Sequence, residues 1–159
     1  MRSDDSAAVL SIFQQGIDGG NATFDEQVPV WAAWDSAFLK QGRWVLENAE
    51  NVVIGWAGLK PVSNRACFSG VAEVSVYVGD HYQGKGLGSI LLRKLILDSE
   101  EHGFWTLQSG IFPENLPSIA VHQKLGFREV GRREKIGKMN GSWRDIILME
   151  RRSRVVGIS

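Results

Sequence analysis

The chain has 159 residues, and its 18 Lys and Arg side chains balance 18 Asp and Glu side chains. A net charge of zero excludes a general attraction to nucleic acid or to an anionic membrane, so any anionic ligand needs a local site. The single cysteine, Cys67, excludes an internal disulfide scaffold, and no apolar run reaches the roughly 18 residues of a membrane span. The polar N-terminus does not resemble a signal peptide. We therefore expect one cytoplasmic domain over residues 1–159, with no membrane or nucleic-acid partner.

The first part of the chain predicts two helices followed by a hairpin. Apolar residues recur at helical spacing over residues 6–18 and, more weakly, over residues 30–39. Residues 43–47 and 52–59 read as strands and flank a polar turn, which indicates a hairpin.

The middle of the chain predicts a strand–helix–strand unit. Residues 73–78 alternate valine with other residue types, as a strand does. A glycine-rich segment at residues 83–88 leads into the strongest apolar stripe of the chain, a helix expected over residues 87–102. A second strand over residues 105–112 would then lie parallel to the first, through a right-handed crossover.

The last part predicts a short helix and a second hairpin. Asn115-Leu116-Pro117-Ser118 opens a helix that ends at Leu125-Gly126. Strands over residues 127–136 and 142–150 are joined through Asn140-Gly141, a strong hairpin dipeptide. The order α, α, β, β, β, α, β, α, β, β predicts an α+β (α/β) protein with a mixed, mostly antiparallel sheet flanked by helices.

The glycine-rich segment predicts an anion site. Gly84, Gly86 and Gly88 precede a helix start, where backbone N–H groups lack partners and the helix dipole favours negative charge. The spacing fits neither the P-loop nor the dinucleotide-binding fingerprint. Taken alone, the segment is equally consistent with a tight turn that binds nothing.

Two motifs together resemble those of the GCN5-related N-acetyltransferase (GNAT) superfamily. Gln83-x-x-Gly86-x-Gly88 is similar to its pyrophosphate loop, and the segment from Asn115 to Phe127 resembles its Asn-led helix closed by Gly-Phe. The closer similarity, over about residues 7–150, is to the phosphinothricin and methionine-sulfoximine N-acetyltransferases. Three stretches carry it: Asn21–Phe24, Glu73–Val78 and Ser118–Phe127. The family usually begins with an extra strand before the first helix, which must be very short or missing here.

The resemblance implies the GNAT fold, with a splayed parallel strand pair, and acetyl-CoA as co-substrate without a metal. The implied cofactor-binding residues are Val76, Val78, Gln83, Gly84, Lys85, Gly86, Leu87, Gly88, Ser89 and Asn115. The main chain around Val76 and Val78 would pair with the pantetheine arm, and Asn115 would contact that arm while capping its helix.

Glu73 and His122 are the implied catalytic residues for direct acetyl transfer to a primary amine, without an acyl-enzyme. Glu73, expected at the start of its strand, would deprotonate the incoming ammonium directly or through water. His122 stands where many superfamily members carry a tyrosine that protonates the leaving thiolate, and histidine can act as acid or base. An exposed strand-end glutamate and a partly buried helix histidine are the structural alternatives.

The implied acceptor is a small amino-acid-like amine of the phosphinothricin, methionine sulfoximine or methionine sulfone type. Phe24, Arg65 and Glu73 are its candidate binding residues. Arg65 lies eight residues before Glu73 and would grip a carboxylate or phosphinate, unless it is a solvated loop arginine. Trp31 and Trp34 are also candidates, although an aromatic pair at helical spacing is more often core.

Other functions stay open at this point. The acceptor could instead be a protein N-terminus or another amine, such as a polyamine or an aminoglycoside. The chain could also be a non-catalytic acetyl-CoA-binding module. The resemblance further implies a homodimer, for which the C-terminal hairpin and Trp143 are candidate contacts.

Overall fold

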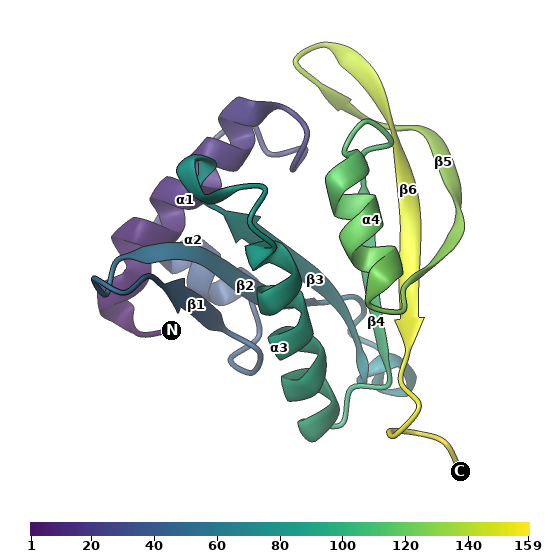
Figure 1. The fold of residues 1–159 in the computed structure, drawn as a ribbon. Coiled ribbons are helices and arrows are strands. Elements are labelled where there is room, and N and C mark those ends of the chain that lie inside the picture. The colour runs from purple at the N-terminus through teal and green to yellow at the C-terminus, as the bar shows by residue number, and fades with distance from the viewer.

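The computed structural model describes residues 1–159, in which four α-helices flank a six-stranded sheet of order β1-β2-β3-β4-β6-β5 (Figure 1). The helices are α1 (Ser6–Gly19), α2 (Trp31–Ala37), α3 (Leu87–Glu101) and α4 (Leu116–Lys124). The strands are β1 (Trp44–Glu47), β2 (Val53–Pro61), β3 (Val71–Val78), β4 (Thr106–Ile111), β5 (Arg128–Met139) and β6 (Ser142–Arg152). The predicted element order and mixed sheet are confirmed. A short 3-10 turn precedes α1 in place of the extra strand, so β1 forms one sheet edge.

Several elements begin or end at other residues than predicted. β3 begins at Val71 because its pairing with β2 extends to Ala72, so Glu73 is the third residue of the strand and does not open it. α2 ends at Ala37 because Phe38 has extended backbone angles. β5 continues to Met139, beyond an irregularity in its pairing with β6.

The first three strands carry apolar side chains on both faces. Ala57, Leu59 and Val74 belong to a buried cluster with the apolar face of α3. On the opposite face, Trp56 and Trp34 are fully buried against α1 and α2. Trp34 stacks on Trp31 with ring centroids 4.8 Å apart, so this pair forms core. The two faces thus give the sheet an α1–α2 side and an α3–α4 side.

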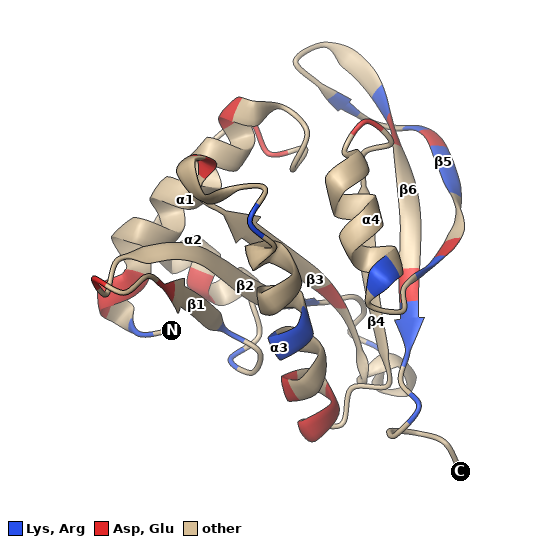
Figure 2. Ribbon diagram, in the orientation of Figure 1, with Lys and Arg blue, Asp and Glu red and all other residues tan.

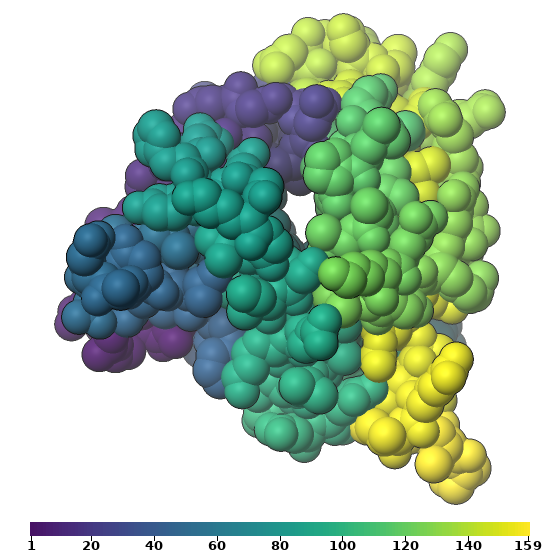
Figure 3. Space-filling model, viewed as in Figure 1, coloured from purple at the N-terminus to yellow at the C-terminus, as the bar shows by residue number.

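The parallel strands β3 and β4 are joined by three residue pairs, Val71 to Thr106, Ala72 to Leu107 and Glu73 to Gln108. Beyond Glu73, β3 continues to Val78 without a partner on that side. β4 instead pairs along its whole length with β6. Figure 3 shows the resulting opening between the teal segments and the green α4. The predicted splayed pair is therefore confirmed.

The neutral net charge conceals a local separation of charge. Lys and Arg residues are concentrated on β5, whereas acidic residues lie at the end of α3 (Figure 2). No helix combines the length and apolar character that a membrane span requires.

Candidate active site

The glycine loop ahead of α3 borders open space. Gly84 and Gly86 adopt positive φ angles of 77° and 76°, which residues other than glycine rarely adopt. A Cβ at Gly84, Gly86 or Gly88 would meet no atom within 4 Å. Because the first amides of α3 have no helical carbonyl as partner, they are available to an anion in this space. The loop therefore fits the pyrophosphate of acetyl-CoA.

A groove of about 510 Å³ extends from this loop past β3 to α4. All of the predicted cofactor-binding residues except Lys85 line it. Lys85 is exposed, with its Nζ 5.7 Å from the centre of the Tyr82 ring. Asn115 caps α4 as predicted, since its Oδ1 accepts a hydrogen bond of 3.3 Å from the Ser118 amide. The roles of these residues toward acetyl-CoA stay predictions.

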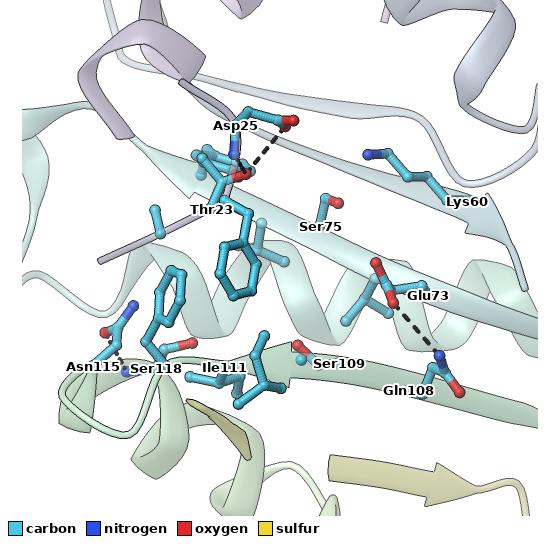
Figure 4. A pocket seen from close by; sticks show the side chains of 18 of the residues that line it. Thr23, Asp25, Lys60, Glu73, Ser75, Gln108, Ser109, Ile111, Asn115 and Ser118 are labelled. Atoms are coloured by element: carbon cyan, nitrogen blue, oxygen red, sulfur yellow. Dashed lines mark hydrogen bonds between the residues drawn. The ribbon is translucent and has the colours of Figure 1, made fainter. Parts of the chain in front are cut away.

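A second cavity, of about 530 Å³, borders the α1–α2 side of the sheet. Glu73 and Ser75 line it from β3, and Lys60 extends toward it from β2 (Figure 4). Tyr77 of β3 lines it as well. Phe24 also lines it, with its ring edge-on to Phe112 at a centroid distance of 4.9 Å, and its role in acceptor binding stays a prediction. We call this space the acceptor cavity.

Arg65 lines neither the groove nor the acceptor cavity. It lies exposed on the loop between β2 and β3, with its guanidinium 5.3 Å from the centre of the Phe68 ring. Its role in acceptor binding stays a prediction that the geometry of this chain does not support.

The groove and the acceptor cavity meet at the opening between β3 and β4. Six residues line both spaces, and we call them the neck: Asn21, Ala22, Val76, Asn115, Ser118 and His122. Two ligands that enter from opposite sides of the sheet would therefore meet at these residues.

His122 is the titratable side chain of the neck, and only 6% of its surface is exposed. Its Nδ1 lies 2.7 Å from the carbonyl oxygen of Ser118. Because a carbonyl only accepts, Nδ1 carries the proton of the neutral ring, and Nε2 keeps a free lone pair. This Nε2 is buried without a hydrogen-bond partner. Burial lowers the pKa of His122 below its ordinary value of 6.5, against the opposing effect of the Ser118 carbonyl.

Glu73 stands at the end of the paired segment of β3. Its Oε2 accepts a hydrogen bond of 3.5 Å from Nε2 of Gln108, its pairing partner on β4 (Figure 4). It borders the acceptor cavity but not the groove. The two implied catalytic residues therefore occupy different positions, His122 in the neck and Glu73 in the acceptor cavity outside the neck.

Several polar side chains of the acceptor cavity were not singled out from the sequence, among them Lys60, Tyr77, Gln108 and Arg133. The alternation of residues 73–78 placed Tyr77 on the same face as Glu73, so a signal for it existed. The other three approach from β2, β4 and β5, and finding them requires the strand registers.

The sequence matches a family model over residues 14–127, that of the Acetyltransferase (GNAT) family. The chain belongs to this family. An L-methionine sulfoximine/L-methionine sulfone acetyltransferase of Pseudomonas paraeruginosa is 32% identical to this GNAT chain, covering 92% of it and 88% of the relative. An L-amino acid N-acyltransferase of Escherichia coli is 33% identical, covering 94% and 89%.

Solved GNAT structures share the fold and the cofactor. A phosphinothricin acetyltransferase from Sinorhizobium meliloti, solved in complex with acetyl-CoA, superposes with a TM-score of 0.90 at 27% identity, covering 100% of this chain and 89% of that chain. The resemblance found in the sequence is therefore confirmed. The protein is an acetyl-CoA-dependent N-acetyltransferase, with acetyl-CoA as its co-substrate.

A bulky residue at Gly88 should weaken acetyl-CoA binding without unfolding the protein. In Gly88→Val, the new side chain enters open space at a position without positive φ, where it would occupy pyrophosphate volume. We expect at least a tenfold higher Kd by calorimetry, about 1.4 kcal/mol. Gly131→Val is the matched control, because a Cβ there also meets no atom but lies outside the groove. Equal affinities for both variants would contradict the loop assignment.

The ring of His122 should titrate below pH 6.5 in the free enzyme. Its pKa is lowered by burial, so the neutral ring persists to more acidic pH than in the unfolded chain. Below about pH 6.5 the unfolded state binds the extra proton more readily, so His122 should also make the fold less stable as the pH falls. ¹⁵N-edited NMR of the imidazole measures both the midpoint and the Nδ1–H tautomer. A midpoint at or above 6.5 would rule this environment out.

Proposed function

We propose that this GNAT enzyme transfers an acetyl group from acetyl-CoA to the primary amine of a small amino acid or amino-acid analogue. Phosphinothricin, methionine sulfoximine and methionine sulfone represent the acceptor class. The observation that carries the proposal is the neck, which joins the acetyl-CoA groove to an acceptor cavity of about 530 Å³. The relatives named for L-methionine sulfoximine and L-amino acids support the same class.

The charges that line the acceptor cavity favour a zwitterion. Asp25 and Glu73 contribute two carboxylates, and Lys60 and Arg133 contribute two cations. A polyamine or an aminoglycoside would call for a mainly acidic lining. The balanced lining instead suits a ligand that carries both an ammonium and a carboxylate group.

Lys60 and Glu73 are suited to bind the two charged groups of one amino acid. They are direct partners in the antiparallel pairing of β2 and β3, so their side chains lie on the same face, with Cβ atoms about 5 Å apart. The side chains of Lys60 and Arg133 form no salt bridge within the chain, and Nζ of Lys60 lies 4.9 Å from the centre of the Phe38 ring. Both cations are therefore free to bind an acceptor carboxylate.

Glu73 and His122 can divide the proton transfers between them. Acetyl-CoA supplies the acetyl thioester. Glu73 takes the first proton from the ammonium group, directly or through water, and this frees the nitrogen lone pair. Nε2 of His122 accepts the second proton as the C–N bond forms, and returns it to the sulfur as the C–S bond breaks. Cys67 is exposed and lines neither space, in keeping with transfer without an acyl-enzyme.

The homodimer expected from the resemblance stays a prediction. Its candidate contact, the β5–β6 hairpin, exposes three large apolar side chains, namely Val130, Ile136 and Trp143.

An acceptor panel should show that the enzyme prefers acceptors with an α-carboxylate. We expect acetylation of methionine sulfone, methionine sulfoximine or phosphinothricin, with kcat/KM about tenfold above that of the matching α-carboxamide. In Lys60→Met, this preference should fall about tenfold through slower turnover of the acid alone. Lys94→Met is the control, because its Nζ lies over Trp44, outside the acceptor cavity. Assays follow thiol release and the acetylated product.

Other outcomes of the panel would replace the proposed acceptor or the enzyme class. Faster acetylation of spermidine, an aminoglycoside or a peptide N-terminus would overturn the amino-acid assignment. Absence of thiol release with every amine would favour a non-catalytic acetyl-CoA-binding module.

Replacing Glu73 with Gln should remove the base and keep the shape of the acceptor cavity. We expect Glu73→Gln to lower kcat about a hundredfold at neutral pH, as loss of a general base does. The Kd for acetyl-CoA should change little, because Glu73 does not border the groove. Glu129→Gln, on the exposed strand β5, should leave both values unchanged. Wild-type turnover by Glu73→Gln from pH 6 to 9 would exclude Glu73 as the base.

A further inference from the structure

The segment that follows α1, residues 20–26, forms one wall of the neck, and we call it the strap. Asn21 and Ala22 line the neck, and Thr23, Phe24 and Asp25 line the acceptor cavity. The strap contains no helix or strand, and its backbone makes one hydrogen bond to another backbone group, at its first residue, Gly20. A segment with so little internal support depends on side-chain contacts for its position.

Arg144 on β6 provides the largest set of these contacts. Its Nη1 donates to the carbonyl oxygen of Gly20 at 2.8 Å, and its Nη2 donates to Oδ1 of Asn21 at 2.8 Å. Nη2 also contacts Oε2 of Glu114 at 3.2 Å. Only 16% of the side chain is exposed, so these charge-assisted bonds are poorly screened by water.

The guanidinium of Arg144 also lies over an aromatic ring. Its Cζ is 3.8 Å from the centre of the Phe112 ring, and the same ring packs against Phe24 of the strap. A planar fork with several donors is needed to bind a carbonyl, an amide and a carboxylate while stacking on a ring. Lysine cannot reproduce this set.

Two further contacts hold the strap to the half of the molecule that contains α4, β4, β5 and β6, to which Arg144 also belongs. Nδ2 of Asn115 donates to the carbonyl oxygen of Asn21 at 3.0 Å. The amide of Asn140, at the tip of the β5–β6 hairpin, donates to Oε1 of Glu26 at 2.7 Å. The strap thus bridges the opening between the two halves of the sheet, and Arg144 is its central attachment.

We propose that Arg144 is a positioning residue for acetyl transfer, which holds Asn21 and Ala22 in the wall of the neck and so sets the width of the passage between thioester and amine. The proposal rests on the proposed function of the same site. Arg144 itself lines neither the groove nor the acceptor cavity, so it acts through the strap.

A loosened strap would widen the neck and admit water. Water would then compete with the amine: its oxygen bonds to the acetyl carbon, the C–S bond breaks, and acetate and free thiol form. One proton of the water passes to the sulfur and the other to solvent. Loss of Arg144 should therefore change the fate of the acetyl group as well as the rate.

The test compares Arg144→Met with Arg144→Lys and with Arg132→Met. Arg132 is the matched control, because it lies on the same hairpin and forms a salt bridge with Asp145 away from the strap. For each variant we would measure kcat, KM for the acceptor, Kd for acetyl-CoA, and the ratio of thiol released to amine acetylated. We expect Arg144→Met to lower kcat/KM for the acceptor at least tenfold and to raise the thiol-to-product ratio at least twofold. Its Kd for acetyl-CoA should change less than threefold.

Arg144→Lys should behave like Arg144→Met, whereas Arg132→Met should match the wild type. Wild-type kinetics and a wild-type thiol-to-product ratio in folded Arg144→Met would overturn the proposal. If Arg144→Met does not fold, Asn21→Ala removes one acceptor of the same guanidinium and should raise the ratio in the same direction; an unchanged ratio counts against the proposal. If the wild type acetylates no amine, the proposed function fails, yet acetyl-CoA hydrolysis should still be faster in Arg144→Met.

Discussion

Three residue pairs hold the parallel strands β3 and β4 together, and the site depends on where this pairing stops. Each strand has a full antiparallel partner on its other side, so the two halves of the sheet are stable without more contact across the middle. Past Glu73 and Gln108, the strands can therefore separate. The groove, the neck and the acceptor cavity all lie along this separation. The pairing leaves Glu73 at the point where the sheet opens.

The electrostatics of the site are local and arise mainly from burial and backbone groups. A chain with equal numbers of acidic and basic residues offers an anion site through the amides at the start of α3. Burial lowers the pKa of His122, and in the neutral ring the Ser118 carbonyl accepts the proton of Nδ1. Two titratable groups with different surroundings can thus take different roles in one reaction, as paired acids and bases do in many enzymes.

The sequence was sufficient for features that depend on neighbouring residues. Helical periodicity, the glycine loop and the Asn-Gly turn predicted the element order, the groove and the hairpin. It was insufficient for features that depend on register. The pairing of Lys60 with Glu73 and the early start of β3 follow from how β2 meets β3. The hydrogen bond from Arg144 to Asn21 joins residues 123 positions apart, and no local sequence pattern predicts such a contact.

From Val74 to Val78, β3 has no partner strand on its β4 side, and this side is a sheet edge in the middle of the molecule. An exposed edge at the rim of a sheet can pair with a strand of another protein. This internal edge of β3 is instead flanked on both sides by residues of its own chain. A ligand that occupies this place binds the folded chain and not the unfolded one. By mass action, free ligand at a hundred times its Kd adds about 2.7 kcal/mol to the free energy of unfolding. The concentration of acetyl-CoA thereby becomes one of the factors that determine how well the enzyme resists thermal unfolding and proteolysis.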